Sequence, residues 1–414
     1  MSKKYTVIDL FAGCGGLLDG FLQTGKYREV ASVEWLKPQV NTLVRRLETK
    51  WGIEDAAERV LYFDIQREEE LFSGWNDDKF GKSKGLDYYV NQVNGVDLII
   101  GGPPCQAYSV AGRVRDENGM KDDYRNYLFE HYLSVVNRYK PKMFVFENVP
   151  GMLSAIPDGT PITQLIKEGF ESIGYEIIDD IKKYAKINAS DYGVPQARNR
   201  LIIIGIRKGL CKDIQETLRC YYENILPKYK VEKKITVKEA IGDLPKYFPV
   251  LDEDLHKKKI AYFSENTSTS ITWHEPRYHN LRDIGIFKML TEDLESGEFR
   301  YTNSKELSKI YEEKVGSKSP IHRYHVLRPD EPSTTIIAHL YKDGNRFIHY
   351  DSRQSRTLTP REAARLQSFD DDFDFIGNRS DAYQMIGNAV PPILAKKIAL
   401  AVEELLENII LKRE

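Results

Sequence analysis

The sequence predicts an α/β fold in which a doubly wound parallel sheet is joined to a second, smaller domain. In the first half of the chain, apolar runs of strand length alternate with segments in which apolar residues recur at helical spacing. This alternation is typical of a parallel sheet covered by helices. Beyond about residue 209 it stops, and lysine-rich pieces, aromatic residues and short strands follow. The length of 414 residues is sufficient for two such domains.

The expected elements follow one another along the chain. Strands are expected at 5–11, 29–35, 59–65, 96–102, 142–149, 175–187 and 200–209, with helices at 17–25, 38–52, 123–141 and 162–174. Proline begins the second helix and glycine ends it, as is common at helix ends. Residues 66–94 are polar and contain glycine, so we expect an excursion from the sheet and assign it no role. Residues 332–341 are expected to form a short strand, and the chain to end with a loop and a long amphipathic helix.

Charge and cysteine usage narrow the class of protein. The formal net charge is -2. The chain therefore lacks the overall positive charge that would indicate nucleic-acid binding. Residues 318–365 nevertheless carry nine Lys/Arg against five Asp/Glu, together with four histidines, which indicates either a local binding surface or an ordinary solvated face. The four cysteines form no CxxC pair, and we assign no metal site and expect a reduced, cytoplasmic chain. No export signal or membrane span is apparent.

The stretch GGPPCQAYSVAG (101–112) places Cys105 just after a buried apolar run. Glycine and proline do not continue a strand, so the thiol is expected on a rigid loop at the carboxyl end of a strand, where open α/β sheets bind ligands. The stretch DLFAGCGG (9–16) follows the first strand, but Leu18 takes the third glycine position of a dinucleotide fingerprint. With Glu34 and Asp64 at later strand ends, this loop favours a cofactor site over a simple tight turn.

Three charged residues follow the later strands. Glu147 ends the fifth strand among apolar neighbours, which would raise its pKa and suit it to donate a proton; alone, it would be read as a surface or capping glutamate. Arg198 and Arg200 in QARNR (196–200) lie on one side of an extended segment. They could bind a phosphate or orient a carboxylate, or be ordinary charges at the edge of a sheet.

Together these stretches resemble the cytosine-C5 DNA methyltransferases. DLFAGCGG, GGPPCQAYS, ENV, QARNR, RTLTPREAARLQSF and QMIGNAVPP occur in the order and approximate spacing of that family. The resemblance covers roughly residues 5–207 and 325–405. Tyr108 and Asp370 stand where phenylalanine and proline are usual, and neither position carries the chemistry.

The resemblance implies a Rossmann-like methyltransferase sheet (1–207, with 377–414 returning to it) and a target-recognition domain with its hinge (208–376). It implies S-adenosylmethionine as cofactor, and double-stranded DNA as partner of a monomeric bacterial protein. It assigns the nucleophile to Cys105, the contact with N3 and the exocyclic amine of cytosine to Glu147, and base holding to Arg198, with Arg200 beside it. Residues 106–124 match a loop that closes over DNA. The cofactor residues are Asp9, Phe11, Ala12, Gly13, Gly15, Gly16, Glu34, Trp35, Asp64, Ile65, Pro103, Asn388 and Ala389.

In this chemistry, a thiolate adds to carbon 6 of cytosine and makes carbon 5 nucleophilic, and the base is flipped out of the duplex because carbon 6 is otherwise out of reach. The expected function is DNA (cytosine-5) methylation, as the modification enzyme of a bacterial restriction–modification system. Two alternatives remain: a transfer-RNA methyltransferase of the same fold and a non-catalytic DNA-binding relative. The long segment before residue 359 favours DNA, and intact Cys105, Glu147 and Arg198 disfavour the non-catalytic protein. A nicotinamide oxidoreductase is weaker still, because the third glycine is missing.

Overall fold

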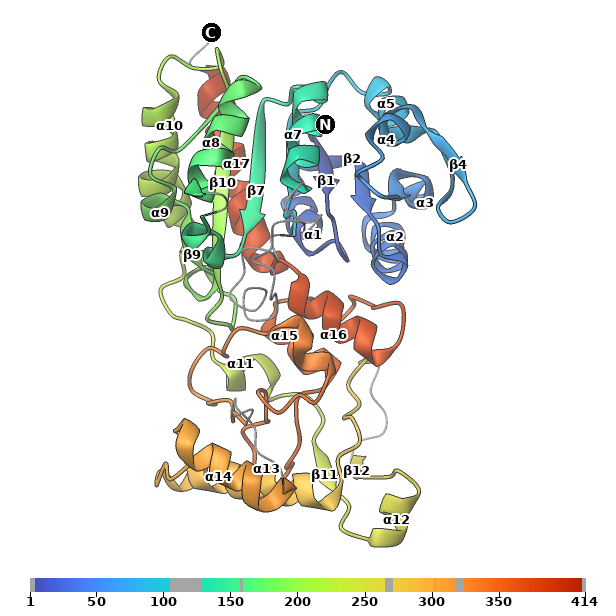
Figure 1. Cartoon of the computed structure of the whole chain (residues 1–414), viewed down its shortest axis with the longest axis vertical. Coiled ribbons are helices and arrows are strands. Elements are labelled where there is room, and N and C mark those ends of the chain that lie inside the picture. Colours follow the sequence, from blue (N-terminus) through green and yellow to red (C-terminus); the bar gives the residue numbers. More distant parts are fainter. Residues whose placement is uncertain are drawn as a thin grey trace. The chain divides into compact units, whose positions relative to one another are not determined.

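The computed structural model describes residues 4–104, 128–156, 159–264, 271–301, 303–316 and 324–411. The chain forms two compact units (Figure 1). Unit 1 comprises residues 1–193, 198–232 and 389–414, and unit 2 comprises 194–197 and 233–388. Unit 1 carries the predicted α/β sheet.

The sheet of unit 1 has eight strands in the order β3-β2-β1-β6-β7-β10-β8, with β9 paired to β10. Their bounds are β1 Tyr5–Leu10, β2 Tyr27–Glu34, β3 Val60–Tyr62, β6 Leu98–Gly101, β7 Met143–Asn148, β8 Tyr175–Ile177, β9 Lys186–Asn188 and β10 Asn199–Arg207. The first five in this order pair in parallel, whereas β10 is antiparallel to β7, β8 and β9. The predicted α/β class is confirmed, with an antiparallel edge added to the parallel core.

Strand order reverses at the centre of the sheet. From β1 the chain moves outward through β2 and β3, and it then returns to place β6 and β7 on the other side of β1. The carboxyl ends of β1 and β6 therefore border a topological switch point, the usual ligand position in open α/β sheets. The turns that follow these two strands contain the glycine-rich stretches 11–16 and 101–104.

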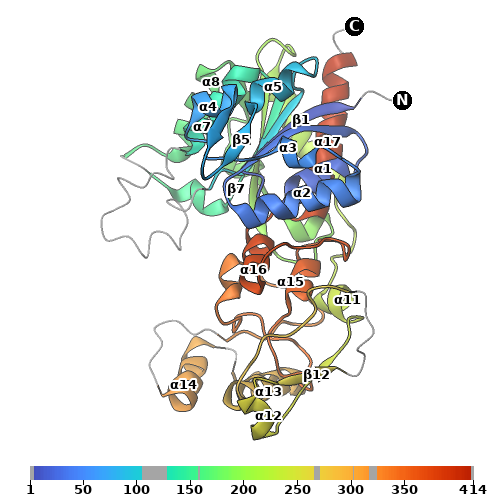
Figure 2. The same cartoon turned by 90° about the vertical axis from the view of Figure 1, so that its right-hand side faces the viewer.

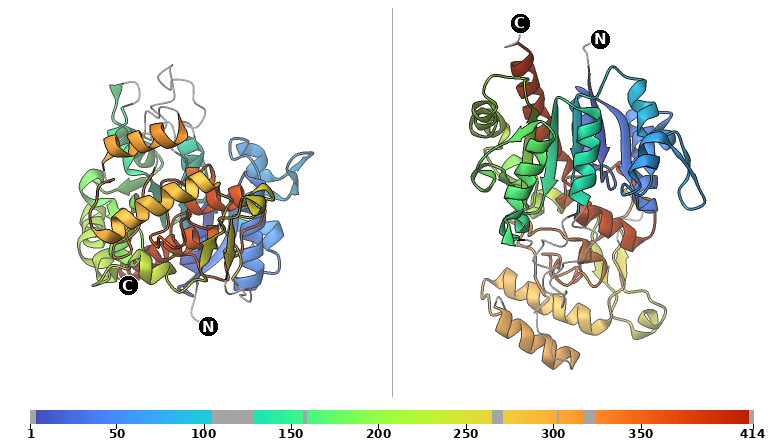
Figure 3. Two further views of the ribbon diagram at one scale, coloured as in Figure 1. Left: turned by 90° about the horizontal axis from the view of Figure 1, so that it is seen from below. Right: turned by 45° about the horizontal axis from the view of Figure 1, so that its top comes forward.

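Helices cover both faces of the sheet, which explains why its central strands are nearly continuous apolar runs. Helices α1 and α17 lie on one face, and α7 and α8 on the other (Figures 1 and 2); in the right-hand view of Figure 3, α7 lies in front of the strands and the red α17 behind them. The helices of unit 1 are α1 Gly16–Leu22, α2 Lys37–Trp51, α3 Ala56–Arg59, α4 Glu68–Ser73, α5 Gly85–Asn91, α7 Leu128–Tyr139, α8 Ile162–Ser172, α9 Ile181–Tyr184, α10 Ile214–Cys220 and α17 Pro392–Leu411.

The excursion at 66–94 is ordered and has its own secondary structure. Helix α4 leads into the hairpin β4–β5 (Trp75–Asp77 and Gly81–Ser83), and α5 then returns toward the sheet. The excursion follows β3, the edge strand. Helix α4 of the excursion contacts α7, where Glu68 accepts hydrogen bonds from His131 and Ser134.

Unit 2 is built mainly of helices and irregular segments. Its elements are α11 Val237–Ile241, β11 Tyr247–Pro249, α12 Glu253–Lys257, β12 Tyr262–Ser264, α13 Leu281–Ser296, α14 Ser304–Val315, α15 Pro360–Leu366 and α16 Arg379–Asn388, with a 3₁₀ turn η8 at Ala338–Tyr341. The side chains of α13 and α14 share a small hydrophobic cluster with Tyr324 and Ile348. This core is independent of the sheet.

The structure corrects several sequence expectations. The expected strand 175–187 is two short strands, β8 and β9, separated by α9. The segment 332–341 forms no ladder beyond an isolated bridge from Ser333 to Gln196 and instead ends in η8. Residues 379–388 are a helix rather than a loop. Asp180 caps α9 by accepting a hydrogen bond from the Lys183 amide, which interrupts the expected strand. Ser333 and Ile336 instead bond to residues 195 and 196.

The unit boundaries also differ from the expected 207/208 and 376/377. Residues 208–232 belong to unit 1, where Tyr222 accepts a hydrogen bond from the Ile204 amide and donates one to the Ile202 carbonyl. Residues 377–388 belong to unit 2, because α16 packs on η8 and Gly387 lies against Ala338. The stretch Arg379–Ile409 is long and apolar enough to cross a membrane by length and composition alone; 67% of its most apolar window is buried within the protein, as is common for a core helix.

Candidate active site

Glu34, the last residue of β2, organises the glycine-rich turn after β1. Its carboxylate accepts backbone N–H bonds from Gly13 at 2.8 Å, Trp35 at 2.9 Å and Leu36 at 2.8 Å. Burial raises the pKa of Glu34, and the three N–H bonds hold part of that rise back. Glu34 therefore joins the turn after β1 to the first turn of α2 and keeps acceptor capacity for a ligand hydroxyl.

Two large apolar side chains next to Glu34 are exposed to solvent. Trp35 is 45% exposed and Leu36 41% exposed, which is unusual for large apolar side chains next to a buried strand. Asp64 lies beyond the end of β3, where Gln66 donates two hydrogen bonds to its Oδ1. Among the described residues no hydrogen bond to Asp64 Oδ2 is formed, so this oxygen can accept one from a ligand.

The other residues that the sequence singled out around β1 and β3 differ in conformation and burial. Phe11 adopts a left-handed conformation with φ of 58°, and Gly15 has φ of 90° immediately before α1. Ala12 and Ile65 are buried, and Gly16 begins α1. Asp9 is buried within β1, and within the described part of the chain neither carboxyl oxygen has a hydrogen bond. Burial, with Glu29 and Glu34 nearby, raises the pKa of Asp9 well above its usual range, which favours the protonated form of this carboxyl group.

The turn after β6 lies directly against Glu147. A Cβ on Gly101 would meet the Leu10 carbonyl at 2.4 Å, and one on Gly102 would meet Glu147 Oε2 at 2.6 Å. A side chain at Gly101 would therefore clash with the backbone, and one at Gly102 would displace the Glu147 carboxylate. Asn148 Nδ2 donates a hydrogen bond of 3.2 Å to the Pro103 carbonyl, so β7 fixes the path of this turn. Cys105 and the matched loop 106–124 lie outside the described residues.

Glu147 and Arg200 are brought together by the antiparallel pairing of β7 and β10. Glu147 lies opposite Ile202, and strand alternation puts Arg200 on the same face. Arg200 Nε is 2.7 Å from Glu147 Oε1, with side chains 11% and 12% exposed. Burial raises the pKa of Glu147, while Arg200 and then Arg198 counteract that rise. The pair thus presents a carboxyl group whose proton affinity is high for a glutamate.

The structure separates the two predicted arginines. Arg198 is completely buried, and its Nη2 donates a hydrogen bond of 3.1 Å to the Ala389 carbonyl. It therefore holds the return of the chain into unit 1, whereas Arg200 pairs with Glu147. Asn388 is the last residue of α16 in unit 2 and is exposed. The sequence analysis did not single out Asn148. Its position as a polar residue at the end of a predicted strand could have indicated a role at the site.

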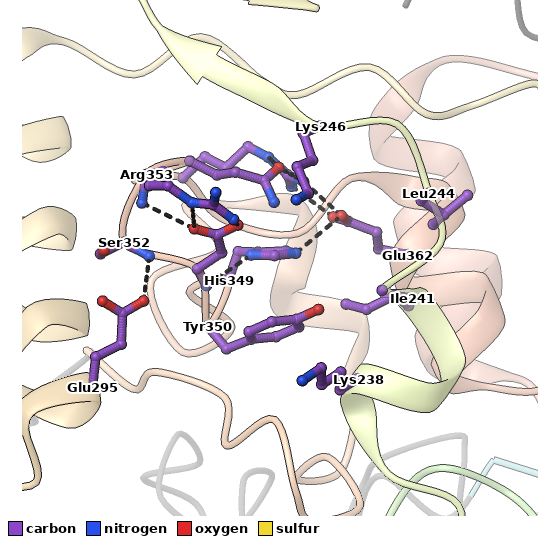
Figure 4. A pocket seen from close by; sticks show the side chains of 14 residues that line it. Lys238, Ile241, Leu244, Lys246, Glu295, His349, Tyr350, Ser352, Arg353 and Glu362 are labelled. Atoms are coloured by element: carbon purple, nitrogen blue, oxygen red, sulfur yellow. Dashed lines mark hydrogen bonds and ion pairs between the residues drawn. The ribbon is translucent and has the colours of Figure 1, made fainter.

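Unit 2 contains a separate polar pocket of about 480 Å³. Figure 4 shows Glu362 facing His349, with Lys238 and Lys246 in the same lining. Arg356 pairs with both Glu362 oxygens at 2.6 Å, and His349 Nε2 is 3.6 Å from Glu362 Oε1. Glu362 also completes a capping box with Thr359 at the start of α15. We interpret this network as structural.

The fold and the site of unit 1 together define a Rossmann-like methyltransferase with an acidic group and an arginine beside the switch point. The chain belongs to the C-5 cytosine-specific DNA methylase family, whose model matches residues 5–404. The protein is thus a DNA cytosine methyltransferase.

Individual relatives agree with this assignment. The chain is 32% identical to the type II methyltransferase M.Bpa9945I of Bacillus paralicheniformis, over 97% of this chain and 99% of the relative. It is 31% identical to M1.HphI of Haemophilus parahaemolyticus, over 97% and 88%. Among solved structures, an Escherichia coli prophage protein assigned as a DNA modification methyltransferase matches with a TM-score of 0.60 at 25% identity, over 98% and 100%. The Schizosaccharomyces pombe Dnmt2 structure matches in fold, with a TM-score of 0.55 at 13% identity, over 98% and 99%.

Proposed function

We propose that the chain methylates carbon 5 of a flipped cytosine in a specific duplex DNA site, with S-adenosylmethionine as the methyl donor and Cys105 as the nucleophile. The proposed setting is a bacterial restriction–modification system, with the enzyme acting as a cytoplasmic monomer. The observation that carries the proposal is the contact between Gly102 and Glu147. It puts the strand end that leads to Cys105 against the acidic group that would face the base.

The donor set of the first turn fits S-adenosylmethionine. Glu34 can accept from ribose hydroxyls, the open Oδ2 of Asp64 can accept from an adenine amine, and the exposed Trp35 ring offers a flat apolar face. Asp9, Phe11, Ala12, Gly13, Gly15, Gly16, Ile65, Pro103, Asn388 and Ala389 remain proposed cofactor residues by resemblance. When bound, this group supplies an electrophilic methyl group.

The chain's own residues account for the remaining chemistry. The Cys105 thiolate forms a bond to carbon 6, and the electron pair of the 5,6 double bond moves toward carbon 5. Glu147, whose pKa burial raises, assists protonation at N3 and so favours this addition. After methylation, a solvent base takes the C5 proton, the C–H electron pair re-forms the 5,6 double bond, and the bond between carbon 6 and sulfur breaks to release the thiolate, which is a good nucleophile and leaving group near pH 7.

Arg200, rather than Arg198, is proposed to contact the base. Arg200 already orients Glu147 and retains donors beyond the one it uses there. Arg198 is proposed to position the Ala389 segment. This assignment changes the expectation that Arg198 holds the base, because burial leaves Arg198 without access to a ligand.

The experiment that tests the proposal is a covalent trap. Fluorine cannot leave carbon 5 as a cation, so duplex DNA with 5-fluorocytosine at the target position should form, with S-adenosylmethionine, a complex that survives denaturing electrophoresis. Cys105→Ser should abolish the complex, because a serine hydroxyl without a strong base is scarcely ionised. Cys14→Ser should still be trapped, since burial raises the pKa of Cys14 to about 12 and keeps it a thiol.

Two results would reject the proposal. The first is a wild-type enzyme that methylates ordinary cytosine but forms no adduct with the fluorinated base. The second is an adduct whose peptide mass maps to Cys14, Cys211 or Cys220.

A further inference from the structure

The segment Phe63–Ile65, which carries the proposed cofactor residue Asp64, has little support from the sheet. It follows β3, a three-residue edge strand that pairs, among the described residues, with β2 alone. Within the sheet, Phe63 makes one further bond, from its amide to the Glu34 carbonyl at 3.1 Å. A segment at a sheet edge needs other contacts to hold one conformation.

Those contacts come from the excursion. The Trp75 ring stacks on Phe63 with centroids 3.8 Å apart and planes at 22°. Phe80 meets Tyr62 and Phe63 edge to face, at 5.0 and 5.2 Å. The Arg67 guanidinium lies 4.8 Å from the centre of the Phe63 ring. We call Arg67, Trp75 and Phe80 the aromatic clasp.

The aromatic clasp is itself firmly held. Asp77 accepts hydrogen bonds from the amides of Lys79 at 2.8 Å and Phe80 at 2.9 Å, which closes the hairpin turn. The Asp77 carboxylate also pairs with Arg67 at 2.7 Å. Trp75 Nε1 donates to the Phe80 carbonyl at 3.3 Å. One side of the Phe63 ring is therefore fixed by a closed set of contacts.

The clasp is also connected to the turn that carries Trp35. Lys37 Nζ lies 4.7 Å from the centre of the Tyr62 ring, and Lys37 begins α2 two residues after Trp35. Tyr62 lies opposite Glu34 in the β2–β3 pairing. The side chains proposed to contact the two ends of the adenosine group, Glu34 and Asp64, thus share one packed support.

We infer that the excursion at 66–94 is a positioning element for the cofactor: the aromatic clasp holds Asp64 and Ile65 in the conformation that binds adenine. This inference rests on the proposed use of S-adenosylmethionine. The geometry favours it over simple surface packing, because the clasp contacts Tyr62 and Phe63 rather than covering a remote part of the sheet. Phe80 acts through these residues and touches no ligand itself.

The test compares Phe80→Ala with Tyr88→Ala in the full chain. Tyr88 is an exposed aromatic residue of the same excursion, and its ring contacts are with Tyr89 and Lys84. The dissociation constant of S-adenosylhomocysteine is measured by calorimetry without DNA. Phe80→Ala should raise it about tenfold, as expected for the loss of one or two aromatic pairs, and Tyr88→Ala should leave it unchanged.

Turnover and conservative variants distinguish positioning from general destabilisation. At saturating S-adenosylmethionine the turnover of Phe80→Ala should stay within about twofold of wild type, because only binding has changed. Phe80→Tyr should restore affinity, and Phe80→Leu should give an intermediate loss if the alanine variant does not fold. Wild-type affinity in folded Phe80→Ala, or an equal loss in Tyr88→Ala, would overturn the inference. Failure of the wild type to bind S-adenosylhomocysteine would instead reject the proposed cofactor.

Discussion

Arg200 and Glu147 form a nearly buried ion pair across the junction of β7 and β10, with Arg200 Nε 2.7 Å from Glu147 Oε1. The two residues are 53 positions apart in the sequence, and antiparallel register alone brings them together. The acidic group of the site is consequently oriented before any base arrives. Preorganised groups of this kind require little rearrangement during the reaction.

The pair predicts a specific loss on substitution. Glu147→Gln should lower the single-turnover methylation rate by about 10²- to 10⁴-fold, the range for removal of a general acid or base. The affinity for S-adenosylmethionine should remain, because Glu34 and Asp64 are untouched. The control is Arg207→Met, which alters an arginine at the end of β10 that bonds the Lys140 carbonyl and not Glu147. A Glu147→Gln enzyme with wild-type rate would remove Glu147 from the chemistry.

Glu34 should affect cofactor binding more than the chemical step. Glu34→Ala removes the acceptor of three backbone N–H groups as well as any bonds to ribose. The Michaelis constant for S-adenosylmethionine should rise between about ten- and a hundredfold, given the strength of hydrogen bonds to charged groups. Glu48→Ala, at an exposed position of α2, serves as control. A large fall in single-turnover rate at saturating cofactor, with unchanged affinity, would contradict this role.

A buried ion pair between α1 and α2 should contribute strongly to the stability of unit 1. Arg46 of α2 pairs with Asp19 of α1 at 2.7 Å, with both side chains 2% exposed, and Trp51 Nε1 donates to the same carboxylate at 2.9 Å. Asp19→Ala should lower the free energy of unfolding by about 3–5 kcal/mol, because it removes the carboxylate that pairs with the buried Arg46 guanidinium. Chemical denaturation measures this change. Glu306→Ala, at a largely exposed pair with Lys309, should have little effect, and an equally small effect of Asp19→Ala would be inconsistent with the buried pair.

Unit 2 should lose stability as the pH falls. Burial lowers the pKa of both His279 and His349 to about 3, so the unfolded chain, with histidine pKa near 6.5, binds the extra protons first. Stability is therefore full above pH of about 6.5 and falls toward pH of about 3, by up to about 1.4 kcal/mol per pH unit for each histidine. Burial alone would raise the pKa of Glu362, but the Arg356 guanidinium outweighs this effect and holds the pKa below its usual value. Unit 2 therefore loses further stability below pH of about 4.3.

Thermal unfolding between pH 7 and pH 4 measures this dependence. His349→Gln should flatten the slope, and His339→Gln, at an exposed position, should not. If the two variants show the same slope of stability against pH, protonation of the buried His349 is not the cause of the pH dependence.

Unit 2 should carry target specificity. Exchange of residues 233–388, the continuous part of unit 2, for the equivalent segment of a relative should transfer the methylated sequence. Junctions at 208 and 376, the bounds expected from the sequence, would remove residues 208–232 from unit 1, including Tyr222 with its two hydrogen bonds to β10. Sequencing of 5-methylcytosine positions in cells that express the chimera gives the result. An active chimera that still methylates the original site would place specificity in unit 1.

The sequence by itself determined the α/β class, most strand positions and the residues of the two central turns. Strands β1, β2, β6 and β7 were predictable because both faces of the sheet are covered, so each is rich in apolar residues on both faces. The strand-end positions of Glu34, Asp64 and Glu147 followed directly. The direction of β10 did not, because an apolar run has the same pattern in a parallel or an antiparallel strand.

Only the tertiary structure decided which of these residues act together. Arg198 and Arg200 have the same strand alternation, yet one is buried against Ala389 and the other pairs with Glu147. The roles depend on which strand lies alongside, and register is set by long-range pairing rather than by local sequence. The same reason applies to the excursion: Trp75 and Phe80 are ordinary aromatic residues of a polar segment until the hairpin folds back and places their rings on Phe63, beside the end of the edge strand.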